Sequence, residues 1–181
     1  MTYVGQSVRR FEDHRLLTGQ GSYVDDMKLP GLLNAVVLRS LHAHANIRSI
    51  DVSAANRVPG VVAVFTAADI QDLAVEIPTR TNTGADEFNP TRHPLLASDK
   101  VCYVGQAVAV LIAEDIYTAA DALDQIVVDY EILPALTDPY EALEPGAMII
   151  HPDQVSNVSL RTVNGGGDLD GAFAQAGHVV R

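Results

Sequence analysis

The sequence predicts an α/β fold in which helices pack on a mixed sheet, and three observations support this prediction. Apolar residues make up 48% of the 181 residues, enough to bury one sizeable core. Short apolar runs typical of strands interleave with helical signals through residues 32–132. Residues 1–31 and 133–181 are instead rich in turn formers. We therefore expect an extended lead-in over 1–31, one α/β domain over 32–132 and a connector over 133–181.

Three strands are expected in the first half of this domain. Residues 32–39 form a short, partly β-branched apolar run that is typical of a buried strand. Residues 45–52 and 61–65 are similar runs, which predict the second and third strands. Between these two, Ser53 is a candidate N-cap of a short helix that would stop at Pro59-Gly60.

A long irregular stretch is expected next. Residues 66–69 have the Thr-x-x-acid spacing of a helix start. Residues 71–99 have no sustained period and several prolines, which indicates an exposed excursion of a kind that is often functional. A strand pair is predicted over 100–104 and 107–113, with Gly105 allowing a bulge or a close backbone approach between them.

The clearest helix signal begins at Asp115, whose carboxylate can accept hydrogen bonds from the free amides of the first turn. Apolar residues then recur at helical spacing and predict one face that packs on a sheet. These residues are Ile116, Ala119, Ala120 and Leu123. A strand over 125–132 follows, and Pro134 is expected to end it.

The connector is expected to hold only short elements, a helix over 169–176 and the start of a strand over 178–180. Its glycine run, 165–167, could cradle an anion through its amides. The run lacks the spacing of phosphate-binding loops, so a flexible linker is the favoured interpretation.

Charge and cysteine content exclude several function classes. With 23 acidic and 12 basic residues the formal charge is −11, which would repel a nucleic-acid backbone. No stretch reaches the ~20 apolar residues of a membrane-spanning helix and no leader is evident at the start, so we expect a cytoplasmic protein without a transmembrane segment. The single cysteine, Cys102, cannot form an internal disulfide or hold an iron–sulfur cluster by itself, and its apolar surroundings favour an inert thiol.

Few residues have a pattern that points to chemistry. His42 and His44 have a spacing seen in metal sites, but no third ligand is near in sequence, so a structural or surface pair is favoured. Paired acidic residues at 25–26, 86–87 and 168/170 are interpreted as solvated surface, because no local feature would separate their pKa values. The segment 103–106 is the one candidate for contact with a partner or another domain, through Tyr103, Gly105 and Gln106; a β-bulge and turn is the alternative.

The sequence contains an ordered series of short motifs: GQ at 5–6, RLLTG at 15–19, YVDD at 23–26, LPG at 29–31, RSLHAHA at 39–45, PGVVAV at 59–64, YVGQAVA at 103–109 and VDYEILPA at 128–135. This series resembles the large, molybdenum-carrying subunits of the carbon monoxide dehydrogenase, xanthine dehydrogenase and aldehyde oxidase family, most of all the carbon monoxide dehydrogenase branch. The resemblance covers most of the chain and implies the α/β hammerhead domain that opens those subunits.

The resemblance also implies a set of cofactors and partners. Downstream domains of the large subunit would hold molybdopterin cytosine dinucleotide. A small subunit with two [2Fe–2S] clusters and a medium subunit with FAD would carry electrons away. The implied reaction is oxidative hydroxylation of carbon monoxide, an aldehyde or a heterocycle, with water as the oxygen source.

The family's catalytic motifs are not matched in this sequence. The Gly-Gly-x-Phe-Gly loop of the molybdenum site does not occur, and the nearest text, at 164–168, has no Phe. The family's catalytic glutamate would lie far beyond Arg181, and its active-site cysteine loop is not found around Cys102. We therefore expect no catalytic, cofactor-binding or metal-binding residue here, and a scaffold domain that is inactive alone. A stand-alone module that binds a protein or a small ligand through residues 71–99 is the alternative.

Overall fold

The computed structural model describes residues 3–73, 76–77, 87–91 and 93–180, and the chain divides into two compact units, Met1–Leu33 and Asn34–Arg181. The first unit contains α1 (Asp13–Leu17) and a short 3-10 helix, η1 (Val24–Asp26), and neither has a buried residue. Helix α1 was not expected in an irregular lead-in. Its first turn is stabilised by Asp13, whose carboxylate accepts hydrogen bonds from the backbone N–H and the Nε of Arg10.

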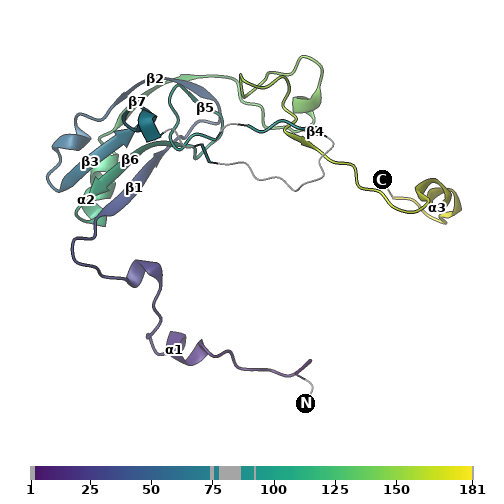
Figure 1. Ribbon diagram of the computed structural model, residues 1–181, viewed down its shortest axis with the longest axis horizontal. Coiled ribbons are helices and arrows are strands. Elements are labelled where there is room, and N and C mark those ends of the chain that lie inside the picture. The colour runs from purple at the N-terminus through teal and green to yellow at the C-terminus, as the bar shows by residue number, and fades with distance from the viewer. Residues whose placement is uncertain (1–2, 74–75, 78–86, 92, 181) are drawn as a thin grey trace. The chain divides into compact units, whose positions relative to one another are not determined.

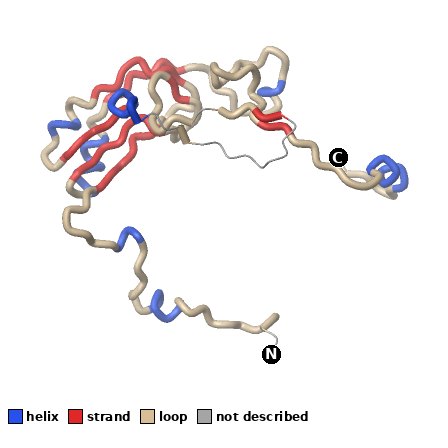
Figure 2. The backbone as a smooth tube through the Cα atoms, in the orientation of Figure 1, coloured by secondary structure: helices blue, strands red, loops and turns tan. Residues whose placement is uncertain are grey.

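The second unit contains two three-stranded sheets, which we call the first and second sheet. The first has the order β1-β6-β3, and the second has the order β5-β2-β7. The strands of the first sheet are β1 (Asn34–Arg39), β6 (Ala107–Ala113) and β3 (Val61–Thr66). Those of the second are β5 (Lys100–Val101), β2 (Ala45–Asp51) and β7 (Val127–Ile132). All of these pairings are antiparallel, so the two sheets are not mixed as expected, while the combination of helices and sheets fits the expected α/β class (Figures 1 and 2).

Helix α2 (Ile116–Leu123) covers one face of the first sheet, as Figure 1 shows. It begins as predicted, because Asp115 Oδ1 accepts hydrogen bonds from the amides of Tyr117 (2.9 Å) and Thr118 (3.0 Å). Its buried face differs from the prediction. Ala119 and Ala122 are fully buried, whereas Ile116 is 47% exposed.

The core consists of two clusters of buried residues. One cluster joins the first sheet to α2 and includes Leu111 of β6 and Ala119. The other joins the two sheets and consists of Ala45, Ala97, Val101 and Val108. Ile50 and Val128 of the second sheet pack against both clusters, so the two sheets share one continuous interior.

Three local predictions are wrong. The short helix after β2 is the 3-10 helix η2 (Ala55–Arg57), and Ser53 does not cap it because the N-cap position is Ala54, which has no side-chain acceptor. The predicted strand pair 100–104 and 107–113 separates, since β5 belongs to the second sheet and β6 to the first. Residues 178–180 form no strand.

The excursion over 71–99 is only partly exposed. It begins with the end of η3 (Ala67–Leu73), which Asp69 caps by accepting a hydrogen bond from Thr66 N–H. The residues that the structure describes near the other end include Leu96 and Ala97, which are buried in the body of the fold. Part of the predicted excursion, 74–75, 78–86 and 92, lies outside the described residues.

The connector holds three short elements, η4 (Glu141–Leu143), β8 (Leu160–Arg161) and α3 (Leu169–Gln175). Strand β8 pairs with β4 (Glu87–Phe88), so the connector returns to the excursion. Helix α3 closely matches its predicted range and is capped by Asp168, whose carboxylate accepts a hydrogen bond from Gly171 N–H. Within the described part of the chain, no helix is long and apolar enough to cross a membrane.

Candidate functional site

The predicted contact segment forms a tight loop between β5 and β6. Gly105 has a φ of +89°, a conformation that side chains disfavour. Its N–H donates to the Ser40 carbonyl (2.8 Å), and its own carbonyl accepts from Arg39 Nη1 (2.9 Å). These hydrogen bonds tie the loop to the end of β1. The position favours glycine through its positive φ and not through a close approach, because a Cβ there would meet no atom within 4 Å.

The three candidate residues of this loop differ in how exposed their side chains are to a partner. Gln106 is 7% exposed, and its Oε1 accepts a hydrogen bond from Cys102 N–H (2.7 Å), so its side chain holds the loop together. Tyr103 and Val104 are 50% and 62% exposed at the tip of the loop. A partner contact at this loop stays a prediction, and in this geometry Tyr103 would make it.

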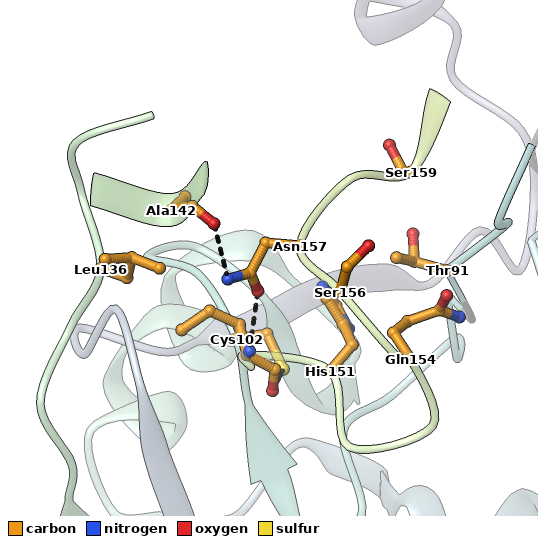
Figure 3. Close-up of a pocket in the computed structure, with 10 residues that line it drawn as sticks. Thr91, Cys102, Leu136, Ala142, His151, Gln154, Ser156, Asn157 and Ser159 are labelled. Atoms are coloured by element: carbon orange, nitrogen blue, oxygen red, sulfur yellow. Dashed lines mark hydrogen bonds between the residues drawn. The ribbon is translucent and has the colours of Figure 1, made fainter. Parts of the chain in front are cut away.

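A half-open cavity of about 250 Å³ lies between the residue after β5 and the connector (Figure 3). Its lining combines one thiol, one imidazole and several neutral polar side chains. The lining residues are Thr91, Cys102, Leu136, Ala142, Ile150, His151, Gln154, Ser156, Asn157 and Ser159. No motif in the sequence pointed to this cavity, because its walls come from three separate stretches of chain.

Asn157 organises this cavity. Its Oδ1 accepts a hydrogen bond from Ile150 N–H (3.2 Å), and its Nδ2 donates to the carbonyls of Ala142 (3.3 Å) and Met148 (2.9 Å). Figure 3 shows the side chain at the centre of the folded connector. A single amide thus satisfies three backbone groups, so we assign Asn157 a positioning role in shaping the connector.

The two titratable groups of the cavity are shifted toward their neutral forms. Burial raises the pKa of the Cys102 thiol, which disfavours the reactive thiolate. Burial, with His93 and Lys100 nearby, lowers the pKa of His151. The Nζ of Lys100 donates a hydrogen bond to the Ile150 carbonyl (2.8 Å). This arrangement favours a packed junction over an activated nucleophile.

The two histidines of the 42/44 pair have separate structural contacts. The ring of His42 packs edge-on against Tyr130, with centroids 5.0 Å apart. His44 is 3% exposed, and its Nδ1 lies 2.6 Å from the Pro134 carbonyl. Because a carbonyl can only accept, Nδ1 carries the proton. The buried Nε2 has no hydrogen-bond partner among the described residues.

The remaining candidates are local features. Gly167 of the glycine run has a φ of +74° and leads into the Asp168 cap of α3. Asp26 accepts a hydrogen bond from Tyr23 N–H (2.9 Å) in an exposed turn. The side chains of the acidic pair at 86–87 lie outside the described part of the structure.

The cavity does not fit the molybdopterin cytosine dinucleotide that the resemblance implies. Sites for drug-sized ligands measure about 300–1,000 Å³, whereas this cavity has about 250 Å³. Its lining has no Lys or Arg to pair with a diphosphate. In the part of the chain that the structure describes, no group of three His, Cys, Asp or Glu residues could hold a metal ion.

Comparison with known proteins gives consistent matches. Residues 18–134 match the family model described as "Aldehyde oxidase and xanthine dehydrogenase, a/b hammerhead domain". The chain is 45% identical over 151 residues to the carbon monoxide dehydrogenase large chain of Afipia carboxidovorans, covering 83% of this chain and 18% of that protein. It is 40% identical over 181 residues to the 6-hydroxypseudooxynicotine dehydrogenase complex subunit gamma of Paenarthrobacter nicotinovorans, covering 99% of this chain and 22% of that protein.

The fold matches a solved structure as well. Quinoline 2-oxidoreductase from Pseudomonas putida 86 superposes with a TM-score of 0.84 and 41% identity over 99% of this chain and 22% of that chain. The chain thus spans about a fifth of the length of the relatives it matches. These relatives are 40–45% identical to the chain and share its fold. Together with the family match over residues 18–134, they establish that this chain belongs to the aldehyde oxidase and xanthine dehydrogenase family and contains its a/b hammerhead domain.

Proposed function

We propose that this chain serves as the hammerhead scaffold of the large subunit of a molybdenum-dependent hydroxylase, in which it supports the reactive centre without contributing catalytic residues. The observation that carries the proposal is the family match over residues 18–134. The character of the cavity supports it, because the polar groups there bind one another and the thiol is held neutral. The parent enzyme would oxidise carbon monoxide, an aldehyde or a heterocycle, taking oxygen from water and releasing two electrons and two protons.

The proposal assigns the cofactors to other polypeptide. Molybdopterin cytosine dinucleotide would lie in downstream domains of the same large subunit. An iron–sulfur small subunit and a flavin medium subunit would accept the electrons, in the cytoplasm. The similarity to the xanthine dehydrogenase molybdenum-binding subunit of Escherichia coli O157:H7, 33% identical over 135 residues, supports a large-chain role of this kind.

The test compares the purified 181-residue chain with the large subunit encoded by the whole gene, produced together with its partner subunits. Molybdenum content is measured by elemental analysis, and activity by dye-linked oxidation. From the chain alone we expect no molybdenum, no visible absorbance and no turnover. From the complex we expect bound molybdenum, visible absorbance and turnover. Stoichiometric molybdenum in the isolated chain would overturn the proposal.

Reading the gene past codon 181 separates this proposal from a stand-alone binding module. An in-frame continuation that contains Gly-Gly-x-Phe-Gly supports the hydroxylase subunit. A stop codon directly after codon 181 supports the binding module instead.

A further inference from the structure

The first sheet has two apolar faces, and only one of them belongs to the core. The core face holds Leu111 and its neighbours, which pack against α2 and the second sheet. The strand registers place six residues on the opposite face, in two rows across β1, β6 and β3. The rows are Ala35, Ile112 and Ala63, and Val37, Val110 and Phe65. We call these six residues the outer face.

The outer face is apolar throughout and incompletely covered. Ala35 is exposed and Phe65 is 37% exposed, while the other four residues are half-buried. None of the six belongs to either core cluster or is among the residues packed against them. An antiparallel sheet that faces water on one side alternates apolar with polar residues. Near-continuous apolar strands such as Val61–Thr66 and Ala107–Ala113 are instead typical of sheets covered on both faces.

The composition of the outer face limits what can cover it. Its six residues include no charged or polar side chain, and the exposed Arg39 lies at its margin, at the end of β1. An apolar centre with a polar margin is typical of a protein interface. A second copy of this chain is disfavoured, because each copy has a formal charge of −11. The matched relatives have about four-fifths of their length outside the region that this chain covers.

From these observations we infer that the outer face is the docking surface for the large subunit's own downstream polypeptide, which covers it within one folded subunit. The inference rests on the proposed function, since it requires a large subunit. Linkage in one chain raises the effective concentration of the two surfaces, so that a modest apolar patch suffices for stable docking.

Thiol labelling tests the inference. Ala35→Cys and Phe65→Cys place a thiol on opposite edges of the outer face. Ser49→Cys, at an exposed position of the second sheet, serves as the matched control. Iodoacetamide labelling is followed by peptide mass spectrometry, so that Cys102 is scored separately. It is measured in the isolated chain, in the complete large subunit alone and in the whole complex.

We expect fast labelling of A35C and F65C in the isolated chain and slowing on the order of 100-fold in the large subunit alone, as for sites that react only through local opening. S49C should report any general change in reactivity. Equal rates in the isolated chain and in a large subunit that contains molybdenum would overturn the inference and leave the proposed function standing. Slow labelling in the dilute isolated chain would also overturn it, since this chain would then cover its own face.

Two further outcomes would show that a different partner covers the outer face. Protection that requires the small or medium subunit would assign the face to that subunit. Protection of the isolated chain that grows with its concentration would assign the face to a second copy. A large subunit that protects both sites but never contains molybdenum would support the docking and reject the proposed function.

Discussion

The two sheets have the same kind of core face and opposite kinds of outer face. On the second sheet the outer positions are polar except for Val127 at the start of β7. Glu131 of β7 accepts a hydrogen bond from Asn46 (3.2 Å) and pairs with Arg48 (3.4 Å), and Ser49 lies opposite Asp129. On the first sheet the six central outer positions are Ala, Val, Ile or Phe, and the exposed Arg39 follows at the end of β1. The alternation in β2 and β7 is typical of a sheet that water wets on one side. The pattern of the first sheet indicates that protein covers both of its sides.

The exposure of a residue in the isolated chain therefore differs from the exposure that its side-chain type would suit in the complete subunit. Leu111 and Val110 are adjacent in β6, but only Leu111 is fully buried. If the first sheet were selected for this chain alone, polar residues at the exposed positions 35 and 65 would cost little. The comparison therefore predicts that mutations on the two faces of one strand have different effects in the chain and in the subunit.

The largest expected effect is on the core face of the first sheet. Leu111→Ala removes a side chain with 0% exposure from the cluster beneath α2. We expect it to lower the free energy of unfolding by about 3 kcal/mol through lost transfer energy and a residual cavity. Val110→Ala, one residue away on the half-buried outer face, should cost about 1 kcal/mol in the same chain. Urea unfolding measures both, and equal losses would contradict the distinction between the faces.

The second sheet can be tested through Ile50, which packs against both core clusters. Because Ile50 is half-buried, Ile50→Ala should cost about 2 kcal/mol, less than a change at a fully buried site. If the sheets form one cooperative unit, amide exchange should accelerate in β6 as well as in β2. Acceleration confined to β2 and β7 would show that the two sheets unfold separately.

The loop that joins the two sheets should be sensitive to its backbone. Gly105 has a φ of +89° with open space around the missing Cβ, so that Gly105→Ala meets a conformational cost without a clash. We expect a loss of about 1 kcal/mol, measured by urea unfolding. Tyr103→Ala, at an exposed position of the same loop, is the control and should leave the unfolding midpoint unchanged.

Local patterns were sufficient to predict most strands of the two sheets and helix α2, but not α1, β4 or β8. Apolar runs identified β1, β2, β3, β6 and β7, and the position of Asp115 identified the start of α2. The face of α2 was predicted less well, because 116/119/120/123 and 119/122/123 both fit a helical period. The small side chains of Ala119 and Ala122 allow the helix to approach the sheet closely, and this preference depends on the partner surface.

The pairing of the strands and the walls of the cavity could not be predicted from local sequence patterns. Strand β5 pairs with β2 over more than fifty residues of sequence, and β4 pairs with β8 over more than seventy. Asn157 bonds to three backbone groups that no sequence spacing relates to one another. The contact role of Tyr103 stays a prediction, because it depends on surfaces that lie outside this chain.

The cap of α2 should give a pH-dependent contribution to the stability of the core face. Hydrogen bonds from the Thr118 hydroxyl and amide hold the pKa of Asp115 below its usual range. A depressed carboxyl pKa stabilises the fold above the unfolded-state pKa of about 3.9, and the contribution is lost as the pH falls through the folded-state pKa. Asp115→Asn retains a capping side chain that does not titrate. The wild type should therefore lose more stability than the variant between pH 5 and pH 2, as measured by thermal unfolding.

The smallest effect is expected on the polar outer face of the second sheet. Arg48 pairs with Glu131 at 3.4 Å, but their side chains are 60% and 44% exposed, so water and salt screen the pair. Arg48→Ala should leave the unfolding midpoint unchanged within error at 0.15 M salt, in the isolated chain and in the complete subunit alike. Ala35→Asp, the reciprocal change at an exposed position of the first sheet, should be tolerated in the isolated chain and prevent assembly of the subunit. If Arg48→Ala destabilised only the subunit, the polar face would be the covered one, and the contrast between the two sheets would be reversed.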